Sequence, residues 1–445
     1  MTDVIREPAR DVPVLADVDV CVLGGSCTGV FAAIRAARLG ASVALVERQN
    51  AFGGVATSGF VNIWHSMLDT EFGQRIMAGL TEETLARLRR REAVFERPNN
   101  PSAGNVLNTA ELKTELDELV LEHGIHHFLH TSYCASQLAD GVIQAVFVEN
   151  KDGRGAIRAR VFIDATGDGD VAAHAGVPFA VADHLQPPTT CAKVQNFPGG
   201  GFRELYRAHR EEFGLAKDSG WQGAVPGVPG LVMVAQTHVF GVDCSDATQL
   251  TAAEIEGRRQ MRAMMDLIRR YGDAPDLALV ELPSYIGIRE TRRFHTDHIL
   301  TEEEVLWGKR FPDAIANGSY RVDVHHPSGG GFLFKYLDGT QLDYCDGGQR
   351  ISGRWRPETA ENPTFYQIPY RTMTSAACPN LLLAGRMIGT DRGAFGAVRV
   401  MVNLNQVGEA AGVAAQLALA ENGHVREVCP DKLRATLAAG GSAVL

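Results

Sequence analysis

The sequence predicts an α/β fold in which a parallel sheet is assembled from both ends of the chain, with an α+β domain inserted between them. An apolar run, a glycine loop, a small-residue helix and a second apolar run succeed one another over residues 18–47. Three alternating runs follow over residues 126–165, and the first style of patterning returns at 363–422. The boundaries we expect are 1–185 and 362–445 for the two parts of the first domain and 186–361 for the insert.

The loop at residues 24–29 has the form of a dinucleotide-binding loop. Gly24 lets the chain turn out of the strand, and Gly29 lets the following helix pack closely on the sheet. The helix start offers free N–H groups and partial positive charge to phosphates. Glu47 ends the second apolar run, where a carboxylate can accept hydrogen bonds from ribose hydroxyls. These parts, in this order, predict an adenine dinucleotide site.

Ser26 is a departure, since it stands where the middle glycine of such loops is expected. Its hydroxyl could donate to a phosphate oxygen. Cys27 lies at a helix start, a position that tends to lower a thiol pKa, but beside a phosphate we expect it to be a small loop residue. The alternative, an ordinary strand–turn–helix with chance glycines, is disfavoured because the helix, second strand and Glu47 are all present.

Composition narrows the class of protein. The 445 residues are 45% hydrophobic and 22% charged, with a net charge of −10. This implies no general attraction to nucleic acid or to an anionic membrane. The eight cysteines form no C-x-x-C pair, which argues against a metal or iron–sulfur site and fits a reduced, cytoplasmic protein. We expect no signal segment and no membrane span.

Only one strand–glycine loop–helix unit is visible, so a second nucleotide domain for a nicotinamide cofactor is not predicted. A single dinucleotide held by segments from both ends of the chain favours FAD over NAD. The first domain is thus predicted to be a split Rossmann-type FAD-binding domain with a parallel sheet and an antiparallel meander at 126–165.

Local patterns predict further elements. Helices are expected within residues 80–124, the second capped by Asn108 or Thr109, and near 251–271. A buried strand is expected at 380–385, followed after a loop by one long helix starting near Ala397.

Several motifs together resemble the FAD-dependent oxidoreductases related to fumarate reductase and succinate dehydrogenase flavoproteins, with a glutathione-reductase-type FAD fold. The motifs are GGVATSG (53–59), DATGDGD (164–170), NLLLAGR (380–386), GAFGAVRVM (393–401), IRETRRFHTDHILTEEEV (288–305) and FPDAIANGSYRVDVHHP (311–327).

The resemblance implies roles by position. The glycine loop would hold the pyrophosphate, Glu47 the ribose, and the Tyr133 backbone the adenine. The helix near Ala397 would direct its amides at the flavin pyrimidine edge. No histidine occurs within 55–57 and His65 comes too late for a covalent link, so FAD is expected to be non-covalent. The cofactor-binding residues we expect are Gly24, Gly25, Ser26, Cys27, Thr28, Gly29, Glu47, Arg48, Gly54, Thr57, Tyr133, Ala165, Thr166, Gly167, Gly385, Arg386, Ala397 and Val398.

Arg289 and His325 are the catalytic candidates, from their place in the family-like segments of the insert. Arginine can hold a carboxylate through two hydrogen bonds, and histidine exchanges a proton near neutral pH. The alternative is that Arg289, Arg292 and Arg293 form structural ion pairs. Trp64 and His65 would wall the pocket, although Trp64 could equally be core.

The function expected is a dehydrogenase or reductase that passes hydride between a small organic substrate and flavin N5. An external electron acceptor or donor is then required. Two alternatives stay open: a flavin monooxygenase or oxidase, and a flavoprotein subunit of an electron-transfer complex or structural flavin binder.

Overall fold

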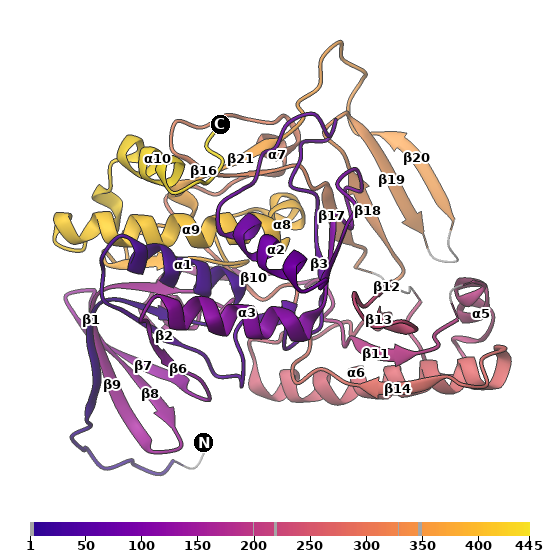
Figure 1. Ribbon diagram of the computed structural model, residues 1–445, viewed down its shortest axis with the longest axis horizontal. Helices are drawn as coiled ribbons and strands as arrows, with labels where there is room; N and C mark the ends of the chain where they lie inside the picture. The colour runs from indigo at the N-terminus through magenta and orange to yellow at the C-terminus, as the bar shows by residue number, and fades with distance from the viewer. Residues whose placement is uncertain (1–3, 199, 218–219, 328, 346–348) are drawn as a thin grey trace.

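The computed structural model describes every residue except 1–3, 199, 218–219, 328 and 346–348, and all of these beyond residue 3 fall in the range expected for the insert. Its central element is a seven-stranded sheet of order β6-β2-β1-β9-β8-β7, with β22 pairing β9 (Figure 1). The strands are β1 (Val14–Leu23), β2 (Val43–Val46), β6 (His126–Phe128), β7 (Ser132–Ala139), β8 (Val142–Asn150), β9 (Gly153–Asp164) and β22 (Leu381–Leu383).

Strand β9 joins the meander to the parallel sheet. Residues 153–158 of β9 pair antiparallel with β8, whereas residues 156–164 lie parallel to β1. The end of β9 also lies parallel to β22, where Leu382 is opposite Ile163. The predicted α/β class and the return of the chain's end to the first sheet are confirmed.

One strand prediction was wrong. The first of the three runs expected within residues 126–165 is two strands, because β6 pairs parallel with β2 and β7 pairs antiparallel with β8. The chain turns between them at His130, whose φ of 50° is left-handed.

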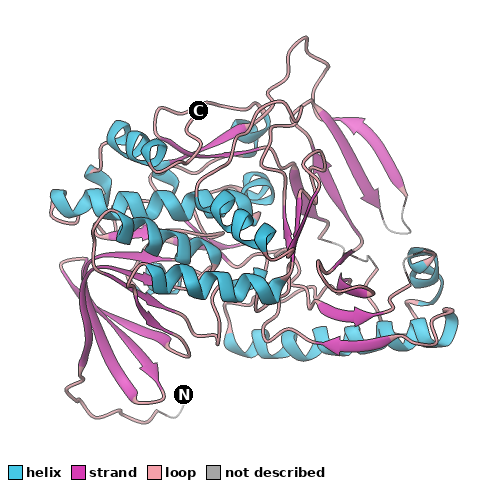
Figure 2. Ribbon diagram, in the orientation of Figure 1, coloured by secondary structure: helices cyan, strands magenta, loops and turns pink. Residues whose placement is uncertain are grey.

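Four helices pack together beside this sheet: α1 (Cys27–Arg38), α2 (Leu80–Arg90), α3 (Thr109–Glu122) and α9 (Met401–Ala418) (Figure 2). Helix α9 lies very close to α1 at Gly408. A Cβ at this position would stand 2.2 Å from the Thr28 carbonyl oxygen, so only glycine fits. The buried Arg35–Glu409 ion pair links the same two helices. Asn108 caps α3 as predicted, accepting from the Ala110 amide at 3.0 Å.

The long C-terminal helix was predicted to start near Ala397, and this start is wrong. The chain forms α8 (Arg392–Val398), breaks at Arg399 and extended Val400, and begins α9 at Met401. Ala397 and Val398 therefore lie near the end of the shorter helix.

Two further sheets build the middle of the chain. The first has the order β12-β13-β11-β14 and packs on α6 (Ala247–Tyr271) and α5 (Phe202–His209). The second is the antiparallel series β17-β18-β19-β20, which projects at the right of Figure 1. Their strands are β11 (Ala192–Gln195), β12 (Trp221–Ala224), β13 (Leu231–Ala235), β14 (Ala278–Glu281), β17 (Val322–His325), β18 (Gly331–Lys335), β19 (Thr340–Cys345) and β20 (Arg350–Arg354).

Short strand pairs complete the fold. The hydrophobic core around the large sheet also includes Phe294, Leu300 and Ile315 from the middle of the chain. None of the helices in the described ranges is long and apolar enough to span a membrane. The remaining elements are β3 (Ile63–Trp64), β4 (Val94–Glu96), β5 (Asn105–Leu107), β10 (Phe179–Val181), β15 (Arg292–Phe294), β16 (Ala314–Gly318), β21 (Tyr366–Pro369), α4 (Asp170–His174), α7 (Glu302–Leu306) and α10 (Pro430–Ala439).

Candidate active site

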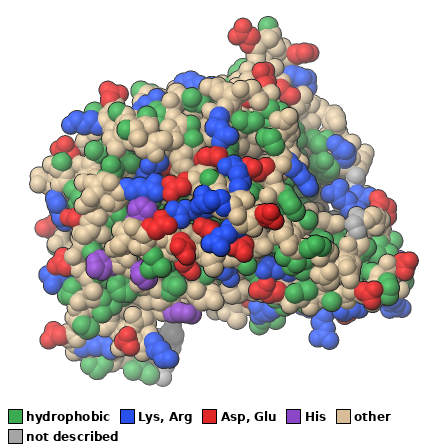
Figure 3. All heavy atoms as spheres, viewed as in Figure 1, with side chains coloured by type: hydrophobic (Ala, Val, Ile, Leu, Met, Phe, Trp, Pro, Cys, Tyr) green, Lys and Arg blue, Asp and Glu red, His purple; other side chains and the backbone are tan. Residues whose placement is uncertain are grey.

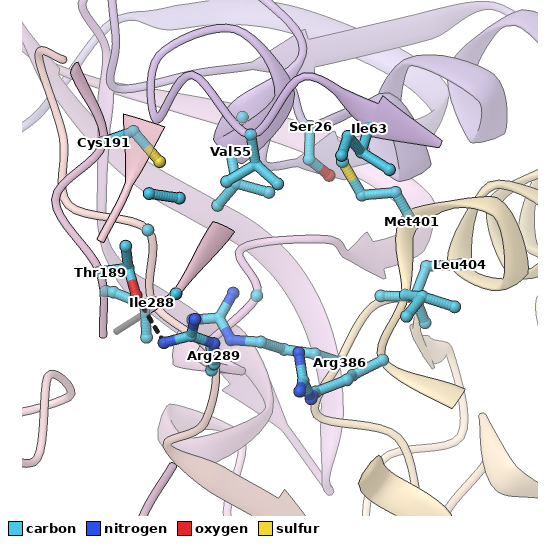
Figure 4. A pocket seen from close by; sticks show the side chains of 18 of the residues that line it. Ser26, Val55, Ile63, Thr189, Cys191, Ile288, Arg289, Arg386, Met401 and Leu404 are labelled. Carbon is cyan, nitrogen blue, oxygen red and sulfur yellow. Dashed lines mark hydrogen bonds between the residues drawn. The ribbon is translucent and has the colours of Figure 1, made fainter. Parts of the chain in front are cut away.

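A cavity of about 820 Å³ runs from the glycine loop to the middle sheets (Figure 4). In the close view, Ser26, Val55 and Met401 lie on one side of the space and Thr189, Ile288 and Arg289 on the other. The cavity thus lies between the first domain's cofactor motifs and the segments in which the catalytic candidates were expected.

The glycine loop approaches its neighbours so closely that side chains are excluded. A Cβ on Gly24, whose φ is 104°, would stand 2.2 Å from the Ala165 carbonyl oxygen, and one on Gly29 would stand 1.9 Å from the Gly24 carbonyl oxygen. A Cβ on Gly25 would stand 2.6 Å from the Phe52 ring. Gly24, Ser26, Cys27 and Thr28 line the cavity, whereas Gly25 and Gly29 lie behind it as packing positions.

Ser26 is the N-cap of α1, and its hydroxyl accepts from the Gly29 amide at 3.4 Å. The hydroxyl proton is therefore left to donate toward the cavity. Cys27 donates to the Gly53 carbonyl at 3.6 Å, and burial raises the pKa of its thiol to about 12. Burial outweighs the helix-start effect, so Cys27 is a neutral thiol here.

Glu47 holds the second side of the loop. Its carboxylate accepts from the Gly25 amide at 2.7 Å and from the Gln49 amide at 2.8 Å. Burial raises the pKa of this carboxyl, while those two backbone bonds act in the opposite direction. The side chain of the neighbouring Arg48 contacts Tyr285, and its guanidinium carbon lies 4.8 Å from the centre of the Tyr285 ring.

Asp164 organises the loop at the end of β9. It is fully buried and accepts from the Thr166 hydroxyl at 2.7 Å and the Ala172 amide at 2.9 Å. Burial raises the pKa of this carboxyl to about 6. The loop it shapes places Ala165, Thr166 and Gly167 on the cavity, beside Tyr133.

Gly54, Gly385 and Arg386 also line the cavity, and Arg386 is paired with Asp168. Thr57 lies outside the lining and is fully buried, with its hydroxyl donating to the Phe52 carbonyl. Ala397 and Val398 are also fully buried and do not line the cavity. The first residues of α9 line it instead, among them Met401, Leu404 and Asn405.

These surroundings fit a bound dinucleotide. Ser58 Oγ and both amide atoms of Asn405 are buried and line the cavity, yet have no hydrogen-bond partner among the residues that the structure describes. Buried polar atoms are normally satisfied. The start of α9 carries no acidic residue and no side-chain cap, so its amide groups remain available to an electron-rich ligand edge.

Arg289, His238 and His325 lie next to one another in the cavity lining. Arg289 donates to the Thr189 hydroxyl at 2.6 Å and to the Pro187 carbonyl, and its Nη2 lies 3.3 Å from His238 Nε2. The His238 and His325 ring centres are 5.0 Å apart. All three line the cavity. The two candidates are thus brought together, with His238 as a third member that sequence reasoning missed.

A second polar cluster consists of His65, Tyr320, Arg321, Asp323 and Arg399, which all line the cavity. Tyr320 donates to Asp323 at 2.8 Å, and Arg399 lies 3.4 Å from the same carboxylate. Although burial raises it, the Arg399 guanidinium lowers the pKa of Asp323 to about 2. Burial lowers the pKa of His65 to about 3, and the nearby arginines add to this shift.

A period-two signal was available for part of this cluster. Arg321, Asp323 and His325 alternate along the extended run that includes β17, so they share a face of the strand. Arg399 and His65 come from distant segments, and no local pattern joins them to it. Trp64 is core, whereas Arg292 and Arg293 pair with Asp170 and Glu290, as the structural alternative supposed.

Three features are typical of a flavoprotein oxidoreductase. The glycine loop packs against a parallel sheet, both ends of the chain contribute strands to that sheet, and the cavity extends from the loop to Arg289 and His325. The family model for FAD-dependent oxidoreductases matches residues 19–437, and the chain belongs to this family. It is accordingly an enzyme that uses FAD. No curated protein sequence matches the chain.

Solved structures similar to the chain include a geranylgeranyl bacteriochlorophyll reductase-like protein from Thermoplasma acidophilum, at 12% identity and TM-score 0.48, covering 95% of this chain and 83% of that one. Another is p-nitrophenol 4-monooxygenase from Pseudomonas putida, at 10% identity and TM-score 0.43, covering 96% and 89%. A myxobacterial chondrochloren halogenase shows 13% identity and TM-score 0.43, covering 95% and 79%. These distant likenesses carry no argument about substrate or reaction.

Proposed function

We propose that the protein is a dehydrogenase or reductase that exchanges hydride between a carbon of a small organic substrate and N5 of non-covalently bound FAD. In this reading it is a relative of the fumarate reductase and succinate dehydrogenase flavoproteins, with an external molecule as the second electron partner. The proposal rests on one observation: Arg289, His238 and His325 are neighbours in the lining of the cavity that the cofactor motifs also line.

Bound FAD would supply the hydride acceptor or donor, held by the glycine loop, Glu47, the 165–167 loop and the start of α9. The chain's own residues would position the substrate. Arg289 is fixed by the Thr189 hydroxyl and the Pro187 carbonyl, so its guanidinium has a defined direction toward an anionic or carbonyl oxygen.

Arg289 also orients its neighbour. A guanidinium only donates, so this hydrogen bond is made when His238 Nε2 accepts, which is the tautomer with its proton on Nδ1. His325, in edge contact with His238 and with the Phe332 ring, would be the group that takes or returns the substrate proton. The aromatic contacts keep bulk water from this imidazole.

The test is purification followed by an absorbance spectrum and anaerobic titration with carboxylic acids, amines and sugars. We expect flavin bands, release of FAD by acid, and bleaching by one substrate class under nitrogen. Substrate that gains an oxygen atom from O₂ would instead indicate a monooxygenase, and hydrogen peroxide formed in proportion to oxidised substrate would indicate an oxidase. A colourless protein that FAD does not reconstitute would overturn the proposal.

A further inference from the structure

The cavity has a basic mouth, formed by Arg203, Arg207, Lys217 and Arg350. All four residues line the cavity, and all four are exposed. The whole chain carries a net charge of −10, so this concentration of positive charge runs against the protein's overall field. The glycine loop at the start of α1 contributes a separate set of lining residues, so the mouth can serve a different ligand group.

The arginines of the mouth come from two walls. Arg203 and Arg207 are four residues apart on α5, so they share one helix face. Arg350 begins β20 on the other side and lies 5.3 Å from the Tyr344 ring centre. Figure 1 shows α5 and the β19–β20 hairpin at the right of the view, and Figure 3 shows Lys and Arg side chains at the right of the same face.

The charges of the three mouth arginines are not offset by a described carboxylate. Among the residues that the structure describes, no carboxylate lies within 4 Å of Arg203, Arg207 or Arg350. Like charges four residues apart on a helix destabilise it unless an anion offsets them. By contrast, the exposed arginines Arg258 and Arg259 of α6 each pair with a glutamate of the same helix.

We propose that the basic mouth binds a multiply charged anionic group, most simply a phosphate, on the part of the substrate that does not react. The guanidinium groups match phosphate oxygens in geometry, and a phosphate carries close to two negative charges. Trp221 lines the same region and offers an apolar surface to the linker between the phosphate and the reacting carbon. The inference rests on the proposed function, since it describes the far end of the same substrate.

The experiment uses FAD-loaded enzyme, so that the dinucleotide loop is already filled. Calorimetry would measure binding of inorganic phosphate and pyrophosphate, with malonate and acetate as carboxylate probes. We expect pyrophosphate to bind most tightly, with affinity falling as salt is raised. Malonate binding as tightly as pyrophosphate would assign the mouth to carboxylates and overturn the phosphate assignment.

Variants distinguish anion binding at the mouth from a general effect of the protein's charge. Arg203→Gln with Arg207→Gln should weaken pyrophosphate binding by about tenfold or more, and Arg350→Gln from the other wall by a similar factor. The control, Arg258→Gln with Arg262→Gln, removes two exposed charges of α6 outside the lining and should change affinity less than about twofold. Flavin absorbance confirms that each variant is folded and loaded.

No pyrophosphate binding, or equal binding in all variants, would overturn the inference. Such a result leaves the proposed function intact if an uncharged substrate still bleaches the flavin under nitrogen. If pyrophosphate binds as expected and no substrate class reduces the flavin, the proposed function fails and the mouth remains an anion site.

Discussion

The two ends of the cavity are built differently. At the proposed cofactor end the glycine loop is packed through its backbone, and Gly24 and Gly29 allow contacts that any Cβ would prevent. At the substrate end the walls are side chains, such as Arg289 and Arg321, presented by irregular segments and short strands. The first end tolerates almost no change of shape, whereas the second can change charge and size without disturbing the sheet.

This difference corresponds to the two tasks in the proposed function, which are holding FAD and binding the substrate. A fixed cofactor can be held by peptide groups, which have one geometry and no charge to tune. A substrate has to be selected and exchanged, which requires groups that carry charge and protons. Substitutions at the two ends should therefore fail in different ways: loss of FAD at one end, loss of turnover with FAD retained at the other.

The largest effect is expected from Gly24→Ala. The added Cβ would meet the Ala165 carbonyl at 2.2 Å in a backbone with φ of 104°, so both strain and collision oppose it. We expect destabilisation of at least about 3 kcal/mol and protein without flavin. Gly40→Ala is the control, because Gly40 has φ of 93° but no atom near the added Cβ. FAD content by absorbance and urea unfolding would measure both; equal losses would show that close approach is not what matters.

The next effect tests the substrate end. Arg289→Gln should lower the rate of flavin reduction by substrate about a hundredfold, as expected for a lost charge-assisted hydrogen bond worth about 3 kcal/mol. FAD content should be unchanged, because the contacts that fix Arg289 come from Pro187, Thr189 and His238, which are outside the cofactor motifs. Arg292→Gln is the matched control, since Arg292 pairs with Asp170 and does not line the cavity. Loss of FAD in the Arg289 variant would break the proposed division of roles.

The third prediction concerns Asp164, a side chain that holds the backbone of the 165–172 loop by accepting hydrogen bonds from Thr166 and Ala172. Its folded pKa of about 6 lies above the ordinary value of 3.8, so between these values the folded state binds the extra proton. The free energy of unfolding should therefore fall by about 3 kcal/mol from this group as pH rises from about 4 to above 6. Asp164→Asn does not titrate, and its urea unfolding curve against pH should be flatter than wild type by that amount. Parallel curves would contradict the assignment.

Local spacing was enough to predict the strand–glycine loop–helix–strand unit at the start of the chain. The glycine loop, Glu47 and the Asn108 cap depend on contacts a few residues away or on one βαβ unit. The start of α9 was missed because Arg399 and Val400 contain no Gly or Pro to signal a break. The cluster of His65, Arg321 and Arg399 was missed because its members come from three distant segments, and only tertiary packing brings them together.

The smallest effect is expected at Ser26. Its side chain caps α1, and the residue also lines the cavity beside the glycine loop. Ser26→Ala removes the cap of α1 and should cost about 1 kcal/mol of stability and several-fold in FAD affinity, whereas Ser26→Gly should cost only a few tenths. Asn108→Ala removes the cap of α3, outside the cavity lining, and should lower stability without changing FAD affinity. Urea unfolding and FAD titration of the apoprotein measure the two quantities. If Ser26→Gly loses as much FAD affinity as Ser26→Ala, the serine hydroxyl itself contacts the pyrophosphate, and the cofactor end is not built from backbone alone.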